Sequence, residues 1–334
     1  TPDTGDTFVY DITAPTISNV VPSWGTHLNA AEDNSDGTIV VTTTGSANGA
    51  TVTVTGMGVT DTCTVSSNSC TVTVAAADLQ GLTDGTTYTI NVALTADAAG
   101  NTVTPDTGDT FVYDITAPTI SDVVPSWDTY LNAAEDNSDG TIAITTSGAA
   151  DGQTVTVTGM GVTDTCALSS NTCTVTVAAA DLQALSDGTT YTITVNVDDV
   201  AGNSATPDTG DTFVYDITAS VTSVTLSDGD YVNAAEDNSD STVTVATSGV
   251  EDGRTMSVTI ASSTFNSVAY SCTVGTNSCA ATIPASALQA LTDGTTYTIS
   301  VTGTDLAGNT ASDSGTTFVY DITAPTISDV VPSW

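Results

Sequence analysis

The chain has 334 residues, and its 39 Asp and Glu residues against a single Arg and no Lys give a formal net charge of -38. Nucleic acid and anionic membrane surfaces are therefore excluded as partners, because the chain has almost no cations to place against phosphate groups. Since 39% of the residues are hydrophobic and Val and Ile recur in strand-like runs, the chain is predicted to fold. Because its carboxylates repel one another, the folded chain is expected to need screening by salt or bound cations.

The composition favours β-structure. Thr, Val, Ala, Asp, Ser and Gly dominate, which is typical of strands and turns rather than helices. No apolar run of about 18 residues and no leader pattern occurs, so neither a membrane span nor a signal peptide is expected within these residues. Because the first residues already belong to a repeat, we expect the sequence to be part of a longer chain.

Internal repetition predicts the domain organisation. The motif Phe-Val-Tyr-Asp-Ile-Thr places its tyrosine at Tyr10, Tyr113, Tyr215 and Tyr320, at spacings of 103, 102 and 105 residues. About one hundred residues suit one β-sandwich of immunoglobulin (Ig) type. We therefore predict the last strand of a preceding repeat (1–10), three repeats (11–113, 114–215 and 216–320) and the first strand of a following repeat (321–334).

Along the first repeat, short alternating strands follow one another with turn residues between them. An acidic loop at residues 29–37 precedes strands at 38–45, 50–56, 70–74 and 86–94, and "DAAGN" at 97–101 precedes the final aromatic strand. The segment 75–82 is too short to be more than a helical turn. The pattern predicts an all-β fold of tandem Ig-like sandwiches in an extended rod, with about seven strands in each.

A tyrosine follows "DGTT" in every repeat, at Tyr88, Tyr191 and Tyr297. This is where an Ig-type sandwich places a tyrosine corner, in which the hydroxyl bonds to the backbone a few residues upstream. A simple core tyrosine is the alternative.

Six cysteines form three pairs with six residues between the members of each pair: Cys63 and Cys70, Cys166 and Cys173, Cys272 and Cys279. The spacing suits neighbouring positions across a hairpin, so one disulfide per repeat is predicted. A zinc site is the rival, but one histidine and two thiols per repeat cannot complete a tetrahedral site. Disulfides indicate an oxidising, extracellular location.

Catalytic chemistry is not expected. His27 is the only histidine and aligns with Tyr130 and Tyr231, which indicates a position for an aromatic ring. A repeated Ser-His-Asp triad is excluded, and no phosphate-binding loop follows a strand. Paired carboxylates for glycoside chemistry are compatible with the acid content, but the acids recur in every repeat, which suits a structural role better than one active site.

A tryptophan closes the "VPSW" segment in the first two repeats and at the end of the sequence, at Trp24, Trp127 and Trp334. The third repeat has "TLSDGD" there. Because a core tryptophan is costly to omit, we predict either a local packing cap, which we favour, or a contact to a neighbouring chain.

Four motifs recur in fixed order in every repeat: Asp-x-Thr-Ala at the start, followed by Pro in two repeats of three, "NAAE", Leu-x-Asp-Gly-Thr-Thr-Tyr, and Asp-x-Ala-Gly-Asn before the last strand. Together they resemble the bacterial Ig-like tandem repeats of giant extracellular (RTX-type) surface adhesins. The resemblance implies an exported stalk of sandwiches, often stiffened by calcium between domains. The paired cysteines depart from that pattern, and the Gly-rich nonapeptides of type I secreted adhesins are absent.

Ig-type topology predicts that acidic loops meet at the joints between repeats, where many oxygens around one linker suit calcium, with six to eight ligands, better than magnesium. The alternative is that Asp and Asn only cap turns. The predicted calcium ligands are Asp114, Asp199, Asn203, Glu32, Asp33, Asp36 and Asp84 at the first joint; Asp216, Asp305, Asn309, Glu135, Asp136, Asp139 and Asp187 at the second; and Asp11, Asp97 and Asn101 at the start of the chain.

The expected function is that of a structural extender, or stalk, of a bacterial surface adhesin, without enzymatic activity and with calcium stiffening the joints. Its expected partners are the neighbouring repeats of the same chain, with no nucleic acid and no direct membrane contact. Two alternatives remain: a subunit of an extracellular filament or surface layer, built by strand exchange or lateral packing of copies, and glycan binding by the acidic loops.

Overall fold

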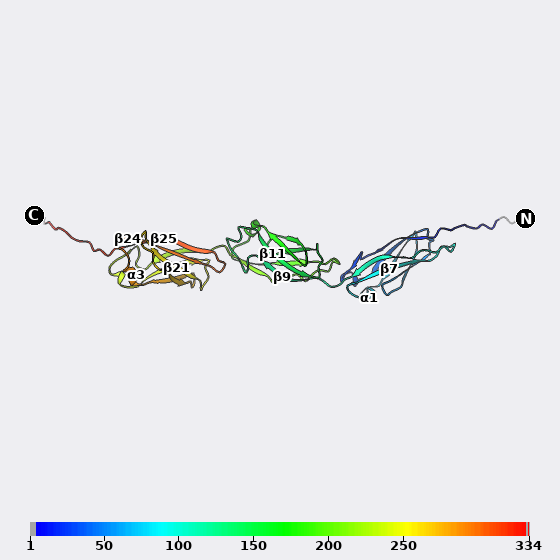
Figure 1. Cartoon of the computed structure of the whole chain (residues 1–334), viewed down its shortest axis with the longest axis horizontal. Coiled ribbons are helices and arrows are strands. Elements are labelled where there is room, and N and C mark those ends of the chain that lie inside the picture. Colours follow the sequence, from blue (N-terminus) through cyan, green and yellow to red (C-terminus); the bar gives the residue numbers. More distant parts are fainter. Residues whose placement is uncertain (1–4, 332, 334) are drawn as a thin grey trace.

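The computed structural model of the protein describes residues 5–331 and 333. Three β-sandwiches follow one another end to end, and the two termini lie at opposite ends of the molecule (Figure 1). Each sandwich has a separate hydrophobic core, drawn from residues 20–113, 123–215 and 224–320. The fold is all-β and Ig-like, as the sequence predicts.

The first repeat has two facing sheets. The three-stranded sheet has the order β1 (Thr16–Pro22), β3 (Gly37–Thr44), β6 (Ser69–Val74). The five-stranded sheet has the order β2 (His27–Leu28), β8 (Asp106–Tyr113), β7 (Thr86–Leu94), β4 (Thr51–Thr55), β5 (Asp61–Thr64). The two-residue strand β2 pairs with β8 in parallel, whereas the other pairs in this repeat are antiparallel. The short helices are η1 (Glu32–Asn34) and α1 (Ala76–Leu79).

The other repeats keep this plan. In repeat 2, β9 (Thr119–Pro125), β11 (Gly140–Ser147) and β14 (Thr172–Val177) form one sheet. The other layer contains β10 (Tyr130–Leu131), β17 (Thr212–Tyr215), β15 (Thr189–Thr192), β16 (Thr194–Val197), β12 (Thr154–Thr158) and β13 (Asp164–Ala167), with helix α2 (Ala179–Leu182) between β14 and β15. In repeat 3, β18 (Ser220–Leu226), β20 (Ser241–Ser248) and β23 (Ser278–Ile283) face β19 (Tyr231–Val232), β25 (Thr310–Tyr320), β24 (Thr295–Thr304), β21 (Thr255–Ala261) and β22 (Tyr270–Thr273), with η2 (Glu236–Asn238) and α3 (Ala285–Leu288).

The alternation of Val and Thr determines which face of each strand enters the core. In β4, Val52 and Val54 are buried while the threonines on either side of them stay partly exposed. Successive side chains of a strand point to opposite faces, so the Thr-Val pattern gives each sheet one apolar face. When two such sheets pack face to face, both apolar faces are removed from water, and this burial is the main favourable contribution to folding.

Trp24 and Trp127 lie in the cores, which corrects the prediction of a cap or an intermolecular contact. Trp24 is 5% exposed, and its ring packs edge-on against Phe111 at a centroid distance of 5.3 Å. Gly37 lies directly against the indole, leaving no room for a Cβ. In repeat 3, Asp228 takes the tryptophan position and Ser241 takes the glycine position, and the two are hydrogen-bonded to each other. Trp334 lies outside the described residues.

The three disulfides are present, and their placement differs from the predicted hairpin. Cys63 lies in β5 and Cys70 in β6, with a Cα–Cα distance of 5.8 Å. These strands pair with β4 and β3 respectively, so they belong to different sheets. The disulfide therefore joins the two sheets at their common edge. Cys166–Cys173 and Cys272–Cys279 repeat the arrangement.

Removing the disulfide of repeat 2 with a Cys166→Ala/Cys173→Ala double variant is expected to lower the free energy of unfolding of that repeat by about 2.5 kcal/mol. The chain-entropy model gives this value for so short a closed loop. Denaturant unfolding of the full chain should show one transition at a lower midpoint, with the transitions of repeats 1 and 3 as internal controls. Unchanged midpoints would show that the edge needs no covalent link.

The tyrosine-corner prediction is confirmed by a hydrogen bond in every repeat. The Tyr88 hydroxyl accepts a hydrogen bond from the backbone N–H of Thr83 at 2.8 Å. In the same way, the Tyr191 hydroxyl accepts from the N–H of Ser186 and the Tyr297 hydroxyl from the N–H of Thr292. His27 lies half-buried in β2, at the position that Tyr130 and Tyr231 occupy in β10 and β19. The aligned position therefore holds an aromatic ring in all three sandwiches.

Two segments lie outside the sandwiches. Residues 5–15 and 321–331 have no strand assignment, and Phe8 and Val330 are 87% and 80% exposed. Their sequences match the last and first strands of the described repeats, but no described sheet includes them. Their assignment to neighbouring repeats stays a prediction. Among the described residues, no helix is long and apolar enough to cross a membrane.

Candidate functional site at the joints between repeats

The loop that precedes the last strand of repeat 2 is ordered by its own hydrogen bonds. Asp199 Oδ1 accepts the backbone N–H of Asn203 at 2.9 Å, and the Asp199 N–H donates to the Asn203 carbonyl at 3.1 Å. Gly202 has φ +92°, a left-handed conformation that favours glycine. The turn therefore requires the Gly-Asn sequence, and it presents the Asn203 carboxamide toward repeat 1.

The Asn203 carboxamide connects three parts of the chain. Its Nδ2 donates to the carbonyl of linker residue Asp114 at 2.8 Å and to Asp199 Oδ2 at 2.9 Å. Its Oδ1 accepts the backbone N–H of Ala30, in repeat 1, at 3.0 Å. Asn203 is only 6% exposed. One buried side chain thus fixes the linker, its own loop and the preceding repeat relative to one another.

Asn29 supplies a second hydrogen bond across the first joint. Its Nδ2 donates to the Ala201 carbonyl of repeat 2 at 2.9 Å, while its Oδ1 accepts the N–H groups of Ala31 and Glu32. This asparagine begins the repeated Asn-Ala-Ala-Glu motif but is not among the predicted site residues. The recurrence of Asn at this position in all three repeats was the signal that could have identified it.

The second joint repeats these contacts. Asn309 Nδ2 donates to the Asp216 carbonyl at 2.7 Å and to Asp305 Oδ2 at 2.8 Å, and its Oδ1 accepts the Ala133 N–H at 3.0 Å. Asn132 donates to the Ala307 carbonyl at 2.9 Å. We refer to the cross-joint hydrogen bonds of Asn203 and Asn29, and of Asn309 and Asn132, as the asparagine latch.

In the first repeat the same loop has no preceding repeat beside it among the described residues. Asn101 bonds to Asp97 Oδ2 at 2.8 Å and to the Asp11 carbonyl at 3.2 Å, and within the described residues it has no bond to another repeat. The Asn101 side-chain bond lowers the pKa of Asp97. The loop therefore forms independently of the joint, and the joint adds contacts to a ready-made turn.

Carboxylates gather around the linker of the first joint. Asp84 accepts the Ile115 N–H at 2.8 Å and the Thr116 hydroxyl, and these bonds lower its pKa. Burial raises the pKa of Asp114, and the nearby charges of Asp199 and Asp84 raise it further. The structure thus brings together four of the predicted ligands, the three aspartates and Asn203.

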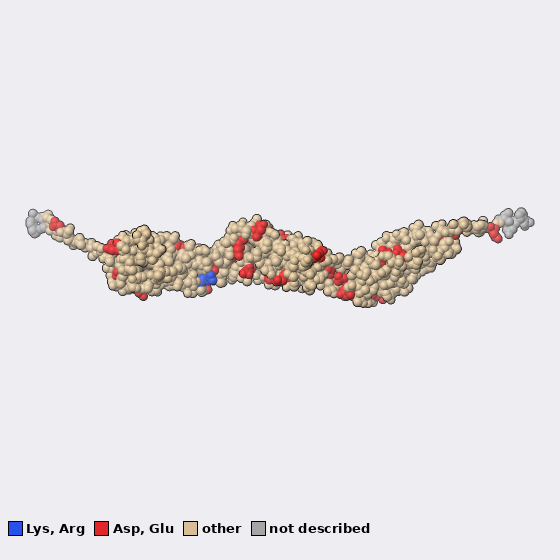
Figure 2. All heavy atoms as spheres, viewed as in Figure 1, with Lys and Arg blue, Asp and Glu red and all other residues tan. Residues whose placement is uncertain are grey.

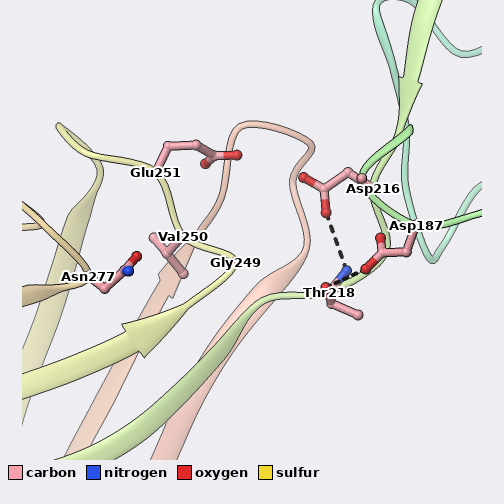
Figure 3. Close-up of a pocket in the computed structure, with 8 residues that line it drawn as sticks. Asp187, Asp216, Thr218, Gly249, Val250, Glu251 and Asn277 are labelled. Atoms are coloured by element: carbon pink, nitrogen blue, oxygen red, sulfur yellow. Dashed lines mark hydrogen bonds between the residues drawn. The ribbon is translucent and has the colours of Figure 1, made fainter. Parts of the chain in front are cut away.

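The second joint carries an additional acid. A cavity of about 310 Å³ lies between Asp187, Asp216 and Thr218 on one side and Gly249, Val250, Glu251 and Asn277 on the other (Figure 3). Glu251 replaces Ala150 of repeat 2, and its Oε2 accepts the Leu306 N–H at 2.8 Å. Burial, followed by the charges of Asp305, Asp187 and Glu251, raises the pKa of Asp216. Sequence reasoning missed Glu251 because only one repeat has it.

No protein-family model and no curated protein matches the chain. Among solved structures, a 1.5-MDa bacterial ice-binding adhesin matches at 27% identity over 92% of this chain and 98% of that chain, with a TM-score of 0.43. A Ca²⁺-stabilized adhesin that helps an Antarctic bacterium reach out and bind ice matches at 30% identity over 91% of this chain and 74% of that chain, with a TM-score of 0.44. A bacterial Ig-like domain of the M. primoryensis ice-binding adhesin matches at 28% identity over 30% of this chain and 95% of that domain, with a TM-score of 0.23.

The chain is similar to the Ig-like repeats of bacterial adhesins. The sequence motifs suggest the same family, and the fold described above is the one that they imply.

The remaining predicted ligands act within single repeats. Glu32 and Glu135 accept the N–H groups of Asn29 and Asn132. Asp36 and Asp139 accept the first N–H groups of α1 and α2, at Ala76 and Ala179. Asp33 and Asp136 are buried and accept the hydroxyls of Tyr113 and Tyr215 at 2.7 Å. Asp11 accepts the Thr13 N–H. Each of these side chains therefore has a hydrogen-bond partner in its own segment of the chain.

The carboxylates at the joints between the described repeats do not form a preassembled metal site. In the part of the chain that the structure describes, no group of three or more His, Cys, Asp and Glu side chains is arranged to hold a metal ion. Both Asp199 oxygens accept bonds from Asn203, and both Asp84 oxygens accept bonds from residues 115 and 116. A calcium ion takes six to eight oxygens, and each of these carboxylate oxygens keeps a second lone pair beside its hydrogen bond.

The buried tyrosine at the end of each repeat predicts alkaline destabilisation. Burial and then the bond to an aspartate raise the pKa of Tyr113, Tyr215 and Tyr320 to about 12. An unfolded tyrosine has a pKa near 10, so the unfolded chain binds fewer protons than the folded chain between about pH 10 and 12. Stability should be fully present below pH 10 and fall above it, by roughly 1.4 kcal/mol per pH unit in each repeat. Denaturant midpoints at pH 9 and pH 11 measure this fall, and equal midpoints would contradict it.

Proposed function

We propose that the chain is an extended spacer of a bacterial surface adhesin, located outside the cell, which holds other parts of the molecule at a distance. The main support is the pair of asparagine latches, which align successive sandwiches end to end (Figure 1). The disulfides suit an oxidising extracellular location. The similarity to adhesin repeats supports the same role.

The spacer has no catalytic chemistry in this proposal. Acidic side chains are spread along all three sandwiches in the face that Figure 2 shows. Most predicted site carboxylates accept hydrogen bonds from nearby backbone or side-chain groups, as turn caps do. The same bonds recur in successive repeats, which supports a structural use of the acids.

Calcium binding at the joints is a second and separable part of the proposal. One similar adhesin is described as Ca²⁺-stabilized. In this chain Asp84 and Asp199 at the first joint, and Asp187, Asp305 and Glu251 at the second, are close enough for their charges to raise the pKa of the linker residues Asp114 and Asp216. Neutralising their mutual repulsion would stiffen joints that already hold by hydrogen bonds.

Small-angle scattering of the full chain in EDTA and in calcium, with a thermal melt of each, tests both parts. The spacer predicts an elongated particle with a maximum dimension close to that of the aligned sandwiches, even in EDTA. Calcium binding predicts a higher melting temperature and a narrower distribution of shapes in calcium. A compact particle in both buffers would contradict the spacer, and identical melts and scattering would contradict only the calcium part.

Filament formation by strand exchange receives less support. Each described sandwich contains its own first strand and its own last strand, in β1 and β8, β9 and β17, and β18 and β25. None of these three sandwiches therefore lacks a first or last strand that another copy would supply. The spacer is therefore the function that the geometry supports best.

A further inference from the structure

A short parallel strand pair occurs in every repeat beside the point where the chain leaves the sandwich. In repeat 2, β10 lies parallel to β17, with Tyr130 beside Val214 and Leu131 beside Tyr215. The backbone N–H of Val214 donates to Thr129 and that of Asp216 donates to Leu131, both at 3.0 Å. Repeats 1 and 3 have the same two bonds at equivalent residues.

The direction of this pair matters when the chain is pulled from its two ends. Tension enters repeat 2 through β9, which is followed directly by β10, and leaves through β17 into the linker. Because β10 and β17 are parallel, opposite pulls on the start of one and the end of the other run along the strands. The hydrogen bonds lie across that direction, so they are loaded together rather than opened one by one.

The strand that precedes β10 is less suited to resist such a pull. The ladder between β9 and β11 contains a register irregularity between Thr145 and Thr146. The same irregularity occurs in the first strand pair of repeats 1 and 3. The outer part of β9 is thus the weaker attachment, and tension then passes to β10.

A buried side-chain bond reinforces the same connection. Tyr215, the last residue of β17, donates its hydroxyl to Asp136, which follows β10 in the chain, at 2.7 Å. Both groups are buried, with Tyr215 1% and Asp136 6% exposed. Repeats 1 and 3 have the pairs Tyr113–Asp33 and Tyr320–Asp237 at the same distance. Leu131 of β10 is fully buried and anchors the strand in the core.

We infer that in each repeat this parallel strand pair and its Tyr–Asp bond form a mechanical clamp, which bears tension applied along the chain. The clamp lies inside each sandwich and does not depend on the joints, on calcium or on the spacer proposal. It would let the repeats stay folded under drag, since unfolding under force follows the unfolding rate rather than the equilibrium stability.

Single-molecule force spectroscopy of the full chain, held by its two ends, tests the clamp. Three unfolding events are expected, one for each repeat. The disulfide keeps the residues of its loop from extending, so each event extends the rest of the repeat only. At ~3.5 Å per extended residue this part is about 330 Å long, and the measured release is that length less the length of the folded repeat. Adding a reductant should lengthen each release by about 25 Å, because the linked cysteines are seven positions apart in the sequence.

The variant Val214→Pro removes the N–H that donates to Thr129 in repeat 2 only. One of the three events should then fall to about half the force of the other two, because one of two backbone bonds of the clamp is lost. Repeats 1 and 3 serve as controls within the same molecule. Three events at the same force would overturn the inference.

Should Val214→Pro fail to fold, two matched core variants decide the question. Leu131→Ala truncates a fully buried leucine of β10, and Leu182→Ala truncates a fully buried leucine of α2 in the same core. Both should lower the melting temperature of repeat 2 to a similar extent. Only Leu131→Ala should lower the unfolding force, and equal forces for the two variants would overturn the clamp.

Discussion

Replacing Gly140 with Ala is expected to lower the free energy of unfolding of repeat 2 by about 3 kcal/mol. A Cβ at this position would overlap the Trp127 ring and approach Leu182 Cδ1 at 3.1 Å. Trp127 is 2% exposed and packs edge-on against Phe213 at 5.2 Å, so the indole has no free space to enter. Overpacking of a filled core typically costs about 1–3 kcal/mol, and a rigid ring belongs at the upper end of that range.

The matched control is Gly210→Ala. Gly210 is exposed, and an added Cβ would meet only Asp208 Oδ1 at 3.5 Å, an ordinary contact. Its effect should stay within about 0.5 kcal/mol, as for most surface substitutions. Denaturant unfolding of the full chain measures both variants on the transition of repeat 2. Similar midpoints for the two variants would show that the indole can move aside.

Repeat 3 suggests a second form of this experiment. There Asp228 and Ser241 occupy the tryptophan and glycine positions together and bond to each other. In repeat 2, Trp127→Asp and Gly140→Ser should each be strongly destabilising alone. The double variant should be more stable than the sum of the two predicts, by about 1–3 kcal/mol, because the two side chains can then pair. Additive effects would show that the two exchanges in repeat 3 are independent.

The architecture was predictable because it rests on local patterns that occur three times. The Thr-Val alternation, the cysteine spacing and the tyrosine after "DGTT" each depend on residues that are close together in the sequence. The burial of Trp24 and Trp127 was harder to predict, because it depends on the glycines that lie against them, Gly37 and Gly140. The simultaneous exchange of both positions in repeat 3 is a signal of that contact, visible in the sequence.

The joints were predicted in position but only partly in chemistry. The topology of an Ig-type sandwich brings the Asp-x-Ala-Gly-Asn loop to the linker, as Asn203 and Asp114 show. Counting carboxylates drew attention to ions, whereas the contacts across the joint are made by carboxamides and backbone groups. Sequence alone does not separate these cases, because Asp and Asn favour the same turns and differ only in what the other side of the joint presents.

Replacing Asn203 with Ala is expected to loosen the first joint. The variant loses hydrogen bonds to the Asp114 carbonyl, Asp199 Oδ2 and the Ala30 N–H, in a site where the asparagine is 6% exposed. Each buried group left without a partner costs about 1–3 kcal/mol, so a total loss of roughly 3 kcal/mol is expected. Part of this loss falls on repeat 2 itself, because Asp199 belongs to the same loop.

The variant Asn101→Ala separates the loss within one repeat from the loss at the joint. Asn101 makes the equivalent bonds to Asp97 and to the Asp11 carbonyl, but none to another repeat in the described residues. Its replacement should lower the melting temperature of repeat 1 and leave the shape of the molecule unchanged. Asn203→Ala should lower the melting temperature of repeat 2 and also broaden the distance distribution in small-angle scattering, since repeats 1 and 2 can then rotate about the linker. Identical scattering from both variants and from the unmodified chain would mean that the linker backbone and the carboxylates around Asp114 hold the joint straight without the asparagine latch.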